Sequence, residues 1–122
     1  MRGIGTDIVD VSRMREKIEK DGGFRQFVFS PEEIAYCGRQ TFPAEHYAAR
    51  FAAKEALLKA LGTGWANGIA FNEISIEHDD KGRPSFRFIG ETAATMAKTG
   101  STTFHVSLSH ERDKALAFVV IE

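Results

Sequence analysis

The sequence predicts a single α+β domain over residues 1–122, with helices packed on one side of a mainly antiparallel sheet. Length is the first observation, because chains usually divide into domains only well beyond 122 residues. The second is the order of the patterns, which runs strand, three helices, hairpin, helix and hairpin. The third is continuity, since no Pro-rich, Ser-rich or single-sign charged linker and no solenoid-length repeat divides the sequence.

In the first segment, residues 4–11, successive side chains divide between two faces in the pattern of a β-strand. Its two faces would carry Ile4, Thr6 and Ile8 on one side and Gly5, Asp7, Val9 and Val11 on the other. Apolar residues on both faces predict a covered strand. Ser12 follows as a candidate cap for a charged helix that ends near Gly22, and we expect Asp10 to cap or pair locally.

Two further helices are marked by their first residues. The segment Ser30-Pro31-Glu32-Glu33 combines a capping box with a first-turn proline, and Gly38 ends the helix that it begins. Pro43 begins a longer helix that runs to about Leu61. A glycine-rich loop around Trp65 follows it.

The second half of the chain predicts two hairpins with a short helix between them. Residues 73–77 and 85–88 alternate on either side of an Asp80-Lys81-Gly82 turn, residues 91–98 predict the helix, and residues 104–109 alternate again. The last strand, residues 116–121, is apolar on both faces, like the first. Because large bare apolar patches are unusual on monomers, a wrapping helix or another copy of the protein must cover the second face.

Composition excludes several classes of protein. Sixteen Lys and Arg against seventeen Asp and Glu give a net charge of −1, so we expect neither nucleic acid nor a membrane surface as partner. The longest apolar run, Ala115–Ile121, is far shorter than the roughly 20 residues of a membrane-spanning helix. Cys37 is the single cysteine, so the chain has no internal disulfide. We expect a cytoplasmic protein.

Two carboxylates are the candidate chemical centre. Asp7 lies in the middle of the first strand, and Glu55 lies on the long helix, on the side of the small residues Ala44, Ala48 and Ala52. If helix and strand approach closely there, the two acids could meet, and a hard divalent ion such as Mg²⁺ would keep both ionised. The alternatives remain open that Asp7 accepts backbone N–H groups or pairs with an arginine, and that Glu55 forms an ordinary surface pair with Lys59.

Other polar residues carry weaker signals. An apolar stripe of Tyr47, Phe51, Leu58 and Leu61 is expected on the long helix, with Lys54 near its middle. The loop Gly62-Thr63-Gly64 lacks a Walker pattern and follows a helix C-terminus, so it either lines a ligand with its N–H groups or only caps the helix. His110 falls at a strand end, and His46 and His78 receive no role.

Three stretches together resemble the holo-acyl-carrier-protein synthase family, the small phosphopantetheinyl transferases. They are Gly3-Ile4-Gly5-Thr6-Asp7-Ile8-Val9-Asp10, the segment from Arg50-Phe51-Ala52-Ala53-Lys54-Glu55 to Gly62-Thr63-Gly64, and Val106-Ser107-Leu108-Ser109-His110. The resemblance implies the phosphopantetheinyl transferase fold and a reaction in support of fatty acid biosynthesis. The phosphopantetheine arm of coenzyme A would pass to a serine of an apo acyl carrier protein, releasing adenosine 3′,5′-bisphosphate.

The resemblance also implies roles for individual residues. Asp7 and Glu55 would bind Mg²⁺ as catalytic residues, together with Lys59 at the phosphates, while the position of a third acid in larger relatives is Val9 here and would be left to water. Coenzyme A would be bound by Arg50, Lys54, Lys59, Gly62, Thr63, Gly64 and His110, although Lys54 could instead pair with a buried acid. The serine proton would go to Glu55 or to a metal-bound water, and these alternatives stay open.

The resemblance further implies a homotrimer with its sites between neighbouring subunits, so that His110 could serve the adjacent subunit's site. An acidic carrier protein would dock on a basic surface that begins at Arg13 and extends over Arg15, Lys17, Lys20 and Arg25. Two other functions stay open: an oligomeric module that binds a nucleotide-like ligand without turnover, and a metal-dependent phosphohydrolase.

Overall fold

The computed structural model describes residues 2–64, 68–101 and 103–122, so Trp65 of the predicted loop lies outside them. The strands are β1 (Gly3–Asp10), β2 (Ile74–His78), β3 (Pro84–Phe88), β4 (Phe104–His110) and β5 (Lys114–Ile121). The helices are α1 (Val11–Lys20), α2 (Phe24–Val28), α3 (Pro31–Gly38), α4 (Pro43–Leu61) and α5 (Gly90–Lys98), with a 3-10 turn η1 (Phe71–Glu73) before β2. No helix in the described ranges is long and apolar enough to cross a membrane.

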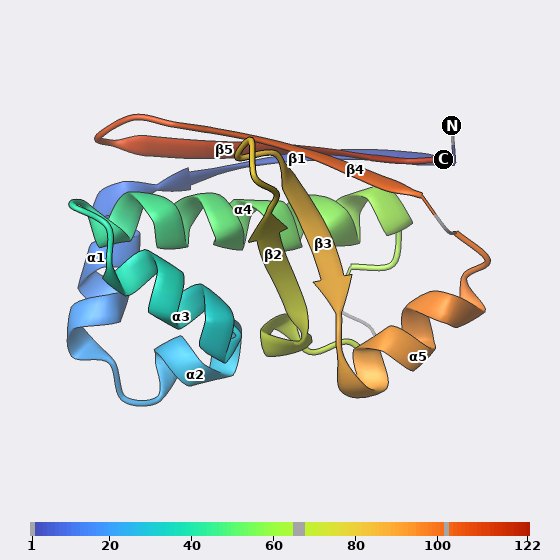
Figure 1. The fold of residues 1–122 in the computed structure, drawn as a ribbon, viewed down its shortest axis with the longest axis horizontal. Coiled ribbons are helices and arrows are strands. Elements are labelled where there is room, and N and C mark those ends of the chain that lie inside the picture. The colour runs from blue at the N-terminus through green and yellow to red at the C-terminus, as the bar shows by residue number, and fades with distance from the viewer. Residues whose placement is uncertain (1, 65–67, 102) are drawn as a thin grey trace.

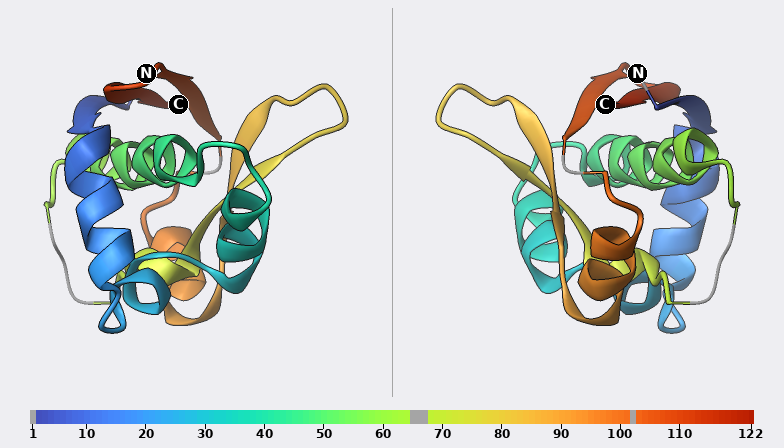
Figure 2. Two further views of the ribbon diagram at one scale, coloured as in Figure 1. Left: turned by 90° about the vertical axis from the view of Figure 1, so that its left-hand side faces the viewer. Right: turned by 90° about the vertical axis from the view of Figure 1, so that its right-hand side faces the viewer.

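The architecture is α+β, as predicted, but its strands form two sheets (Figure 1). One is a three-stranded antiparallel sheet in the order β1-β5-β4, with Asp7 opposite Ala117. The other is the β2–β3 hairpin, in which Ile76 is opposite Phe86. The end views show α4 directly beneath the three-stranded sheet, α1 running down beside it and the other helices further below, so the prediction of helices on one side holds for that sheet (Figure 2).

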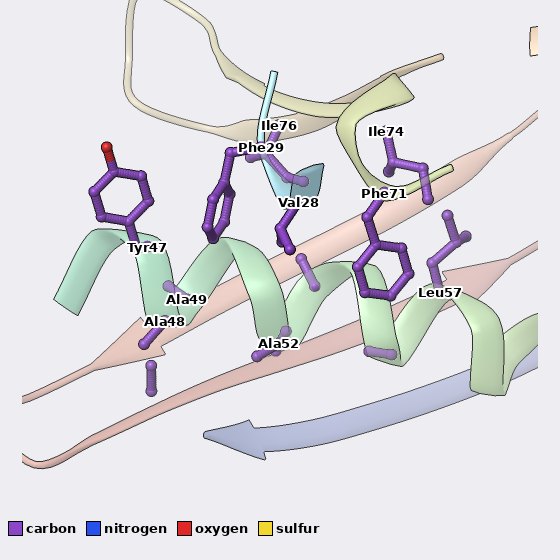
Figure 3. Close-up of a cluster of buried hydrophobic side chains, with 14 of the residues drawn as sticks. Val28, Phe29, Tyr47, Ala48, Ala49, Ala52, Leu57, Phe71, Ile74 and Ile76 are labelled. Carbon is purple, nitrogen blue, oxygen red and sulfur yellow. The ribbon is translucent and has the colours of Figure 1, made fainter. Parts of the chain in front are cut away.

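Helix α4 lies at the centre of the molecule rather than at its surface. Lys59 is the only exposed residue between positions 44 and 60. Figure 3 shows Tyr47 and Leu57 on the side of α4 that meets Phe29 and Phe71, with Ala52 toward the sheet. The expected stripe of Tyr47, Phe51, Leu58 and Leu61 is therefore wrong as a description of the buried surface. The sheet covers one side of the helix, and α2, η1 and the hairpin cover another, so α4 is buried nearly all round.

Strand β1 approaches α4 closely because two of its inward residues are glycines. A Cβ added at Gly5 would overlap the carbonyl oxygen of Ala56, and one added at Gly3 would overlap the carbonyl oxygen of Ala60. The close approach predicted from small helix residues therefore occurs, but it depends on these two strand glycines as well. The next inward residue after Gly5 is Asp7, which the packing holds beside α4.

Capping residues explain where helices α1 and α3 begin. The capping box at Ser30 is confirmed, since its hydroxyl accepts from Glu33 N while Glu33 Oε1 accepts from Ser30 N. The cap of α1 is Asp10, whose carboxylate accepts from Ser12 N, so the prediction of Ser12 as the cap is wrong by two residues. Helix α2 was not expected, because its five residues are too few to show a helical period.

The outer face of the three-stranded sheet is apolar and exposed. Ile8 is 65% exposed and Phe118 44%, and Ile4 and Leu116 are also exposed. The described part of the chain supplies no helix over this face (Figure 1). Of the two covers expected from the sequence, a wrapping helix is thus absent from the described residues, and cover by another copy of the protein stays a prediction.

The close approach of β1 to α4 predicts a large effect of one added methyl group. In Gly5→Ala, the Cβ has no space against the backbone of Ala56, and we expect the free energy of unfolding to fall by about 3 kcal/mol. Urea denaturation followed by circular dichroism measures this change. The matched control is Gly38→Ala, where no described atom lies within 4 Å of the added carbon. Equal unfolding midpoints for the two variants would contradict the packing argument.

Candidate active site

The two predicted carboxylates converge on one hollow. Asp7 on β1 and Glu55 on α4 both line it, together with Arg13, Met14 and Lys17 of α1 and with Phe51. The convergence follows from the fold, because Asp7 points inward from β1 two residues after Gly5, and Glu55 precedes Ala56, whose carbonyl meets that glycine. We call this the carboxylate hollow.

Lys59 bridges to Asp7 rather than forming the ordinary surface pair with Glu55. Its Nζ donates to Asp7 Oδ1 at 3.0 Å and to the carbonyl oxygen of Thr6 at 3.0 Å. The lysine side chain is 55% exposed and the aspartate side chain 19%. A cation therefore lies beside Asp7 and open to solvent, although Lys59 lines a neighbouring hollow with Thr6 and Phe118.

The electrostatics of the hollow fit a hard divalent cation. Burial raises the pKa of Glu55, the Asp7 carboxylate raises it further, and Lys59 acts in the opposite direction. A pair of neighbouring carboxylates is the donor set that Mg²⁺ favours, since it binds one or two carboxylates and keeps several waters. Within the described ranges, no group of three His, Cys, Asp or Glu side chains is arranged to hold a metal ion.

The basic residues predicted to form one docking surface have different surroundings. Arg13 and Lys17 line the carboxylate hollow itself. Arg15 and Lys20 are exposed on α1. Arg25 is partly committed within the chain, because its guanidinium donates to the carbonyl oxygen of Ile18 and lies 3.8 Å from the Asp21 carboxylate.

Lys54 lies in the core, so the prediction that it binds the cofactor does not fit the structure. Its Nζ donates to Glu33 Oε1 at 2.6 Å and to the carbonyl oxygens of Val28 and Phe71. Both side chains of the ion pair are 0% exposed. Burial lowers the pKa of Lys54 to about 8, against the opposing effect of Glu33. This is the alternative of a buried acid partner, and an ammonium with three donors in use has none for a ligand.

Arg50 and His110 lie in a second hollow, away from Asp7 and Glu55. Its lining includes Tyr36, His46 and His78, and we call it the histidine hollow. The Arg50 guanidinium lies over the Tyr36 ring, 4.4 Å from its centroid, and contacts His78 Nδ1 at 3.2 Å. Within one chain, Arg50 and His110 are thus separated from the hollow that Asp7 and Glu55 line.

Sequence reasoning missed His46 and His78. The His46 ring packs edge-on against His110 with centroids 4.9 Å apart, and the His78 ring stacks on Tyr36 at 5.2 Å. A signal for His46 was present, because it precedes Arg50 by one helical turn on α4. His78 gave none, because the placement of the hairpin against α3 and α4 is decided by tertiary packing.

The glycine loop caps helix α4, which is one of the two roles expected of it. Gly62 caps α4 in the left-handed region at φ 77°, and its N–H bonds to the carbonyl oxygens of Leu58 and Lys59. Thr63 lines a further hollow with Arg2 and Ser101, which does not include Asp7 or Glu55. The expectation that this loop binds coenzyme A stays a prediction.

Comparison with known proteins gives one consistent family. The model of the 4′-phosphopantetheinyl transferase superfamily matches residues 3–119. A holo-[acyl-carrier-protein] synthase of Syntrophus aciditrophicus is 47% identical over 123 residues, covering 100% of this chain and 96% of the relative.

Solved structures agree with the sequence relatives. The holo-[acyl-carrier-protein] synthase of Neisseria meningitidis superposes with a TM-score of 0.91 at 38% identity, covering 100% of this chain and 98% of that one. The Helicobacter pylori synthase, solved in complex with coenzyme A, superposes with a TM-score of 0.85 at 29% identity, covering 98% and 99% of the two chains.

Proposed function

The chain belongs to the 4′-phosphopantetheinyl transferase superfamily, and on that basis we propose that it is a holo-[acyl-carrier-protein] synthase. It transfers the 4′-phosphopantetheine group of coenzyme A to a serine of an apo acyl carrier protein and releases adenosine 3′,5′-bisphosphate. The proposal rests on full-length similarity to holo-[acyl-carrier-protein] synthases, one of which was solved with coenzyme A. The transfer contributes to fatty acid biosynthesis.

The observation that carries the mechanism is the convergence of Asp7 and Glu55 on one hollow. These two carboxylates would hold Mg²⁺. When bound, the ion would neutralise the pyrophosphate of coenzyme A and the charge that grows on the leaving group. Lys59, exposed and bonded to Asp7, would add positive charge beside the two carboxylates. The hollow therefore binds and orients the pyrophosphate, which is the main requirement of this transfer.

We propose a homotrimer in which each site lies between two subunits. The exposed apolar face of β1 and β5 supports this proposal, because association would bury Ile8 and Phe118. The separation of Arg50 and His110 from Asp7 and Glu55 within one chain supports it too. One subunit would contribute Asp7, Glu55 and Lys59, and its neighbour Arg50 and His110, to the same coenzyme A. A cytoplasmic location is compatible with Cys37, which is free and buried.

We propose that the acidic carrier protein docks over α1. Arg13 and Lys17 line the carboxylate hollow, so a partner bound to them would bring its serine toward Asp7 and Glu55. Arg15 and Lys20 extend the same basic helix, and Arg25 contributes less because Asp21 is close to it. Such charge pairing speeds encounter and weakens as salt is added.

Transfer is tested by mass spectrometry of an apo acyl carrier protein incubated with the chain, coenzyme A and Mg²⁺. We expect the carrier to gain one phosphopantetheine group. Asp7→Asn and Glu55→Gln, which keep shape but remove charge, are expected to reduce the rate by about a hundredfold or more. Chelation with EDTA should stop the reaction, and added Mg²⁺ should restore it. Asp80→Asn, in the exposed hairpin turn, is the control variant. Release of phosphate without modified carrier would instead identify a phosphohydrolase.

The docking proposal separates the two substrates kinetically. Reversing the charge in Arg13→Glu should raise the KM for the carrier about tenfold and leave the KM for coenzyme A within about twofold. Lys98→Glu on α5 makes the same change in net charge away from α1 and should alter neither. If Arg13→Glu raised the KM values for the carrier and for coenzyme A equally, the carrier would not be docking at this helix.

The assembly proposal predicts a three-chain species in sedimentation velocity. Phe118→Glu places a charge on the exposed sheet face and should shift the protein toward the mass of one 13.5 kDa chain. Phe27→Glu is the matched control, because Phe27 is 71% exposed on α2, away from the sheet. A wild-type protein that sediments as a single chain at micromolar concentration would refute the trimer.

A further inference from the structure

We propose that Glu45 is a positioning residue that orients His110 toward a phosphate group bound in the histidine hollow. The inference rests on the proposed function, in which His110 contacts coenzyme A. It extends that function to a residue whose chemistry the sequence did not reveal. Glu45 stands in the first turn of α4, whereas His110 is the last residue of β4.

The contact is short and partly shielded from water. Oε1 of Glu45 lies 2.9 Å from Nδ1 of His110, and the two side chains are 11% and 31% exposed. An ionised carboxylate can only accept a hydrogen bond, so Nδ1 carries the hydrogen. The ring is thereby fixed in one tautomer and one orientation, and Nε2 is the nitrogen left for a ligand.

The other groups of the histidine hollow explain why this support matters. Burial lowers the pKa of His46, and so do the neighbouring His110 and Arg50. Burial likewise lowers the pKa of His78, with a further contribution from Arg50. Those two rings are therefore poor sources of positive charge near neutral pH. Arg50 supplies one fixed cation, and the Glu45 carboxylate at hydrogen-bond distance from Nδ1 leaves Nε2 as the His110 nitrogen that can hydrogen-bond a bound phosphate.

A purely structural role for Glu45 is the competing explanation. A carboxylate in the first turn stabilises a helix through its dipole. That role would be independent of His110 and would not fix the tautomer of its ring. The two explanations can therefore be separated by readouts other than stability.

The first measurement is the ¹⁵N spectrum of the histidine rings in the free protein. Wild type is expected to show the Nδ1–H form of His110, with the hydrogen held by Glu45. Glu45→Gln should lose this preference, because a neutral amide can donate to Nδ1 as well as accept from it. Glu45→Ala, which removes all hydrogen-bonding atoms, is the second variant. Glu111→Gln, at the exposed neighbour of His110 in sequence, should leave the ring signals unchanged.

The second measurement is a double-mutant cycle on coenzyme A. Glu45→Gln should weaken coenzyme A binding in calorimetry, and raise its KM, about five- to twentyfold, with kcat within about twofold of wild type. His110→Ala should have an effect of similar size. Adding Glu45→Gln to His110→Ala should then cost less than about twofold more, because Glu45 acts through the ring.

The outcomes separate this inference from the proposed function. The role of Glu45 would be overturned if the double variant lost affinity by the product of the two single losses, or if the His110 tautomer were unchanged in both Glu45 variants. Either result would leave the transferase proposal intact. A wild-type protein that transfers phosphopantetheine, with coenzyme A binding insensitive to His110→Ala, would also overturn the role of Glu45. Failure of the wild type to bind coenzyme A at all would overturn both.

Discussion

The contact of the α4 backbone with β1 is the constraint on which the site depends. Gly3 and Gly5 allow the strand to lie against the carbonyl oxygens of Ala60 and Ala56, closer than any side chain would permit. At that separation the short side chain of Asp7 reaches the hollow that Glu55 lines, and its carboxylate reaches Lys59. A wider spacing would leave the two acids on separate surfaces. The position of the Asp7 carboxylate thus follows from the close packing of Gly5, two residues earlier, against Ala56.

Helix α4 sends three charged residues to three different environments. Lys54 enters the core and holds α2, η1 and α3 together through Val28, Phe71 and Glu33. Glu55, one residue later, turns into the carboxylate hollow, and Lys59 reaches the surface. Loss of one member of the buried pair would leave an uncompensated charge, which is far costlier than loss of a surface pair. The same short stretch therefore serves both stability and the proposed catalysis.

If the proposed assembly forms, the two hollows and the exposed sheet face would act together in one binding site. The carboxylate hollow offers metal ligands and basic docking residues, whereas the histidine hollow offers Arg50 and a carboxylate-supported His110. Neither has the complete set for a ligand with several phosphates. The exposed Ile8 and Phe118 supply the apolar surface that could join copies and bring the two hollows together.

The sequence by itself determined the α+β class, the limits of α4 and the capping box at Ser30. Those follow from local rules: hydrophobic period, capping chemistry and side-chain alternation act over a few residues. Tertiary structure decided that Lys54 is a core residue, because only packing placed Glu33 against it. It also decided that Arg50 and His110 share a hollow with His46 and His78, since hydrogen bonds and ring contacts between residues far apart in sequence leave no local pattern.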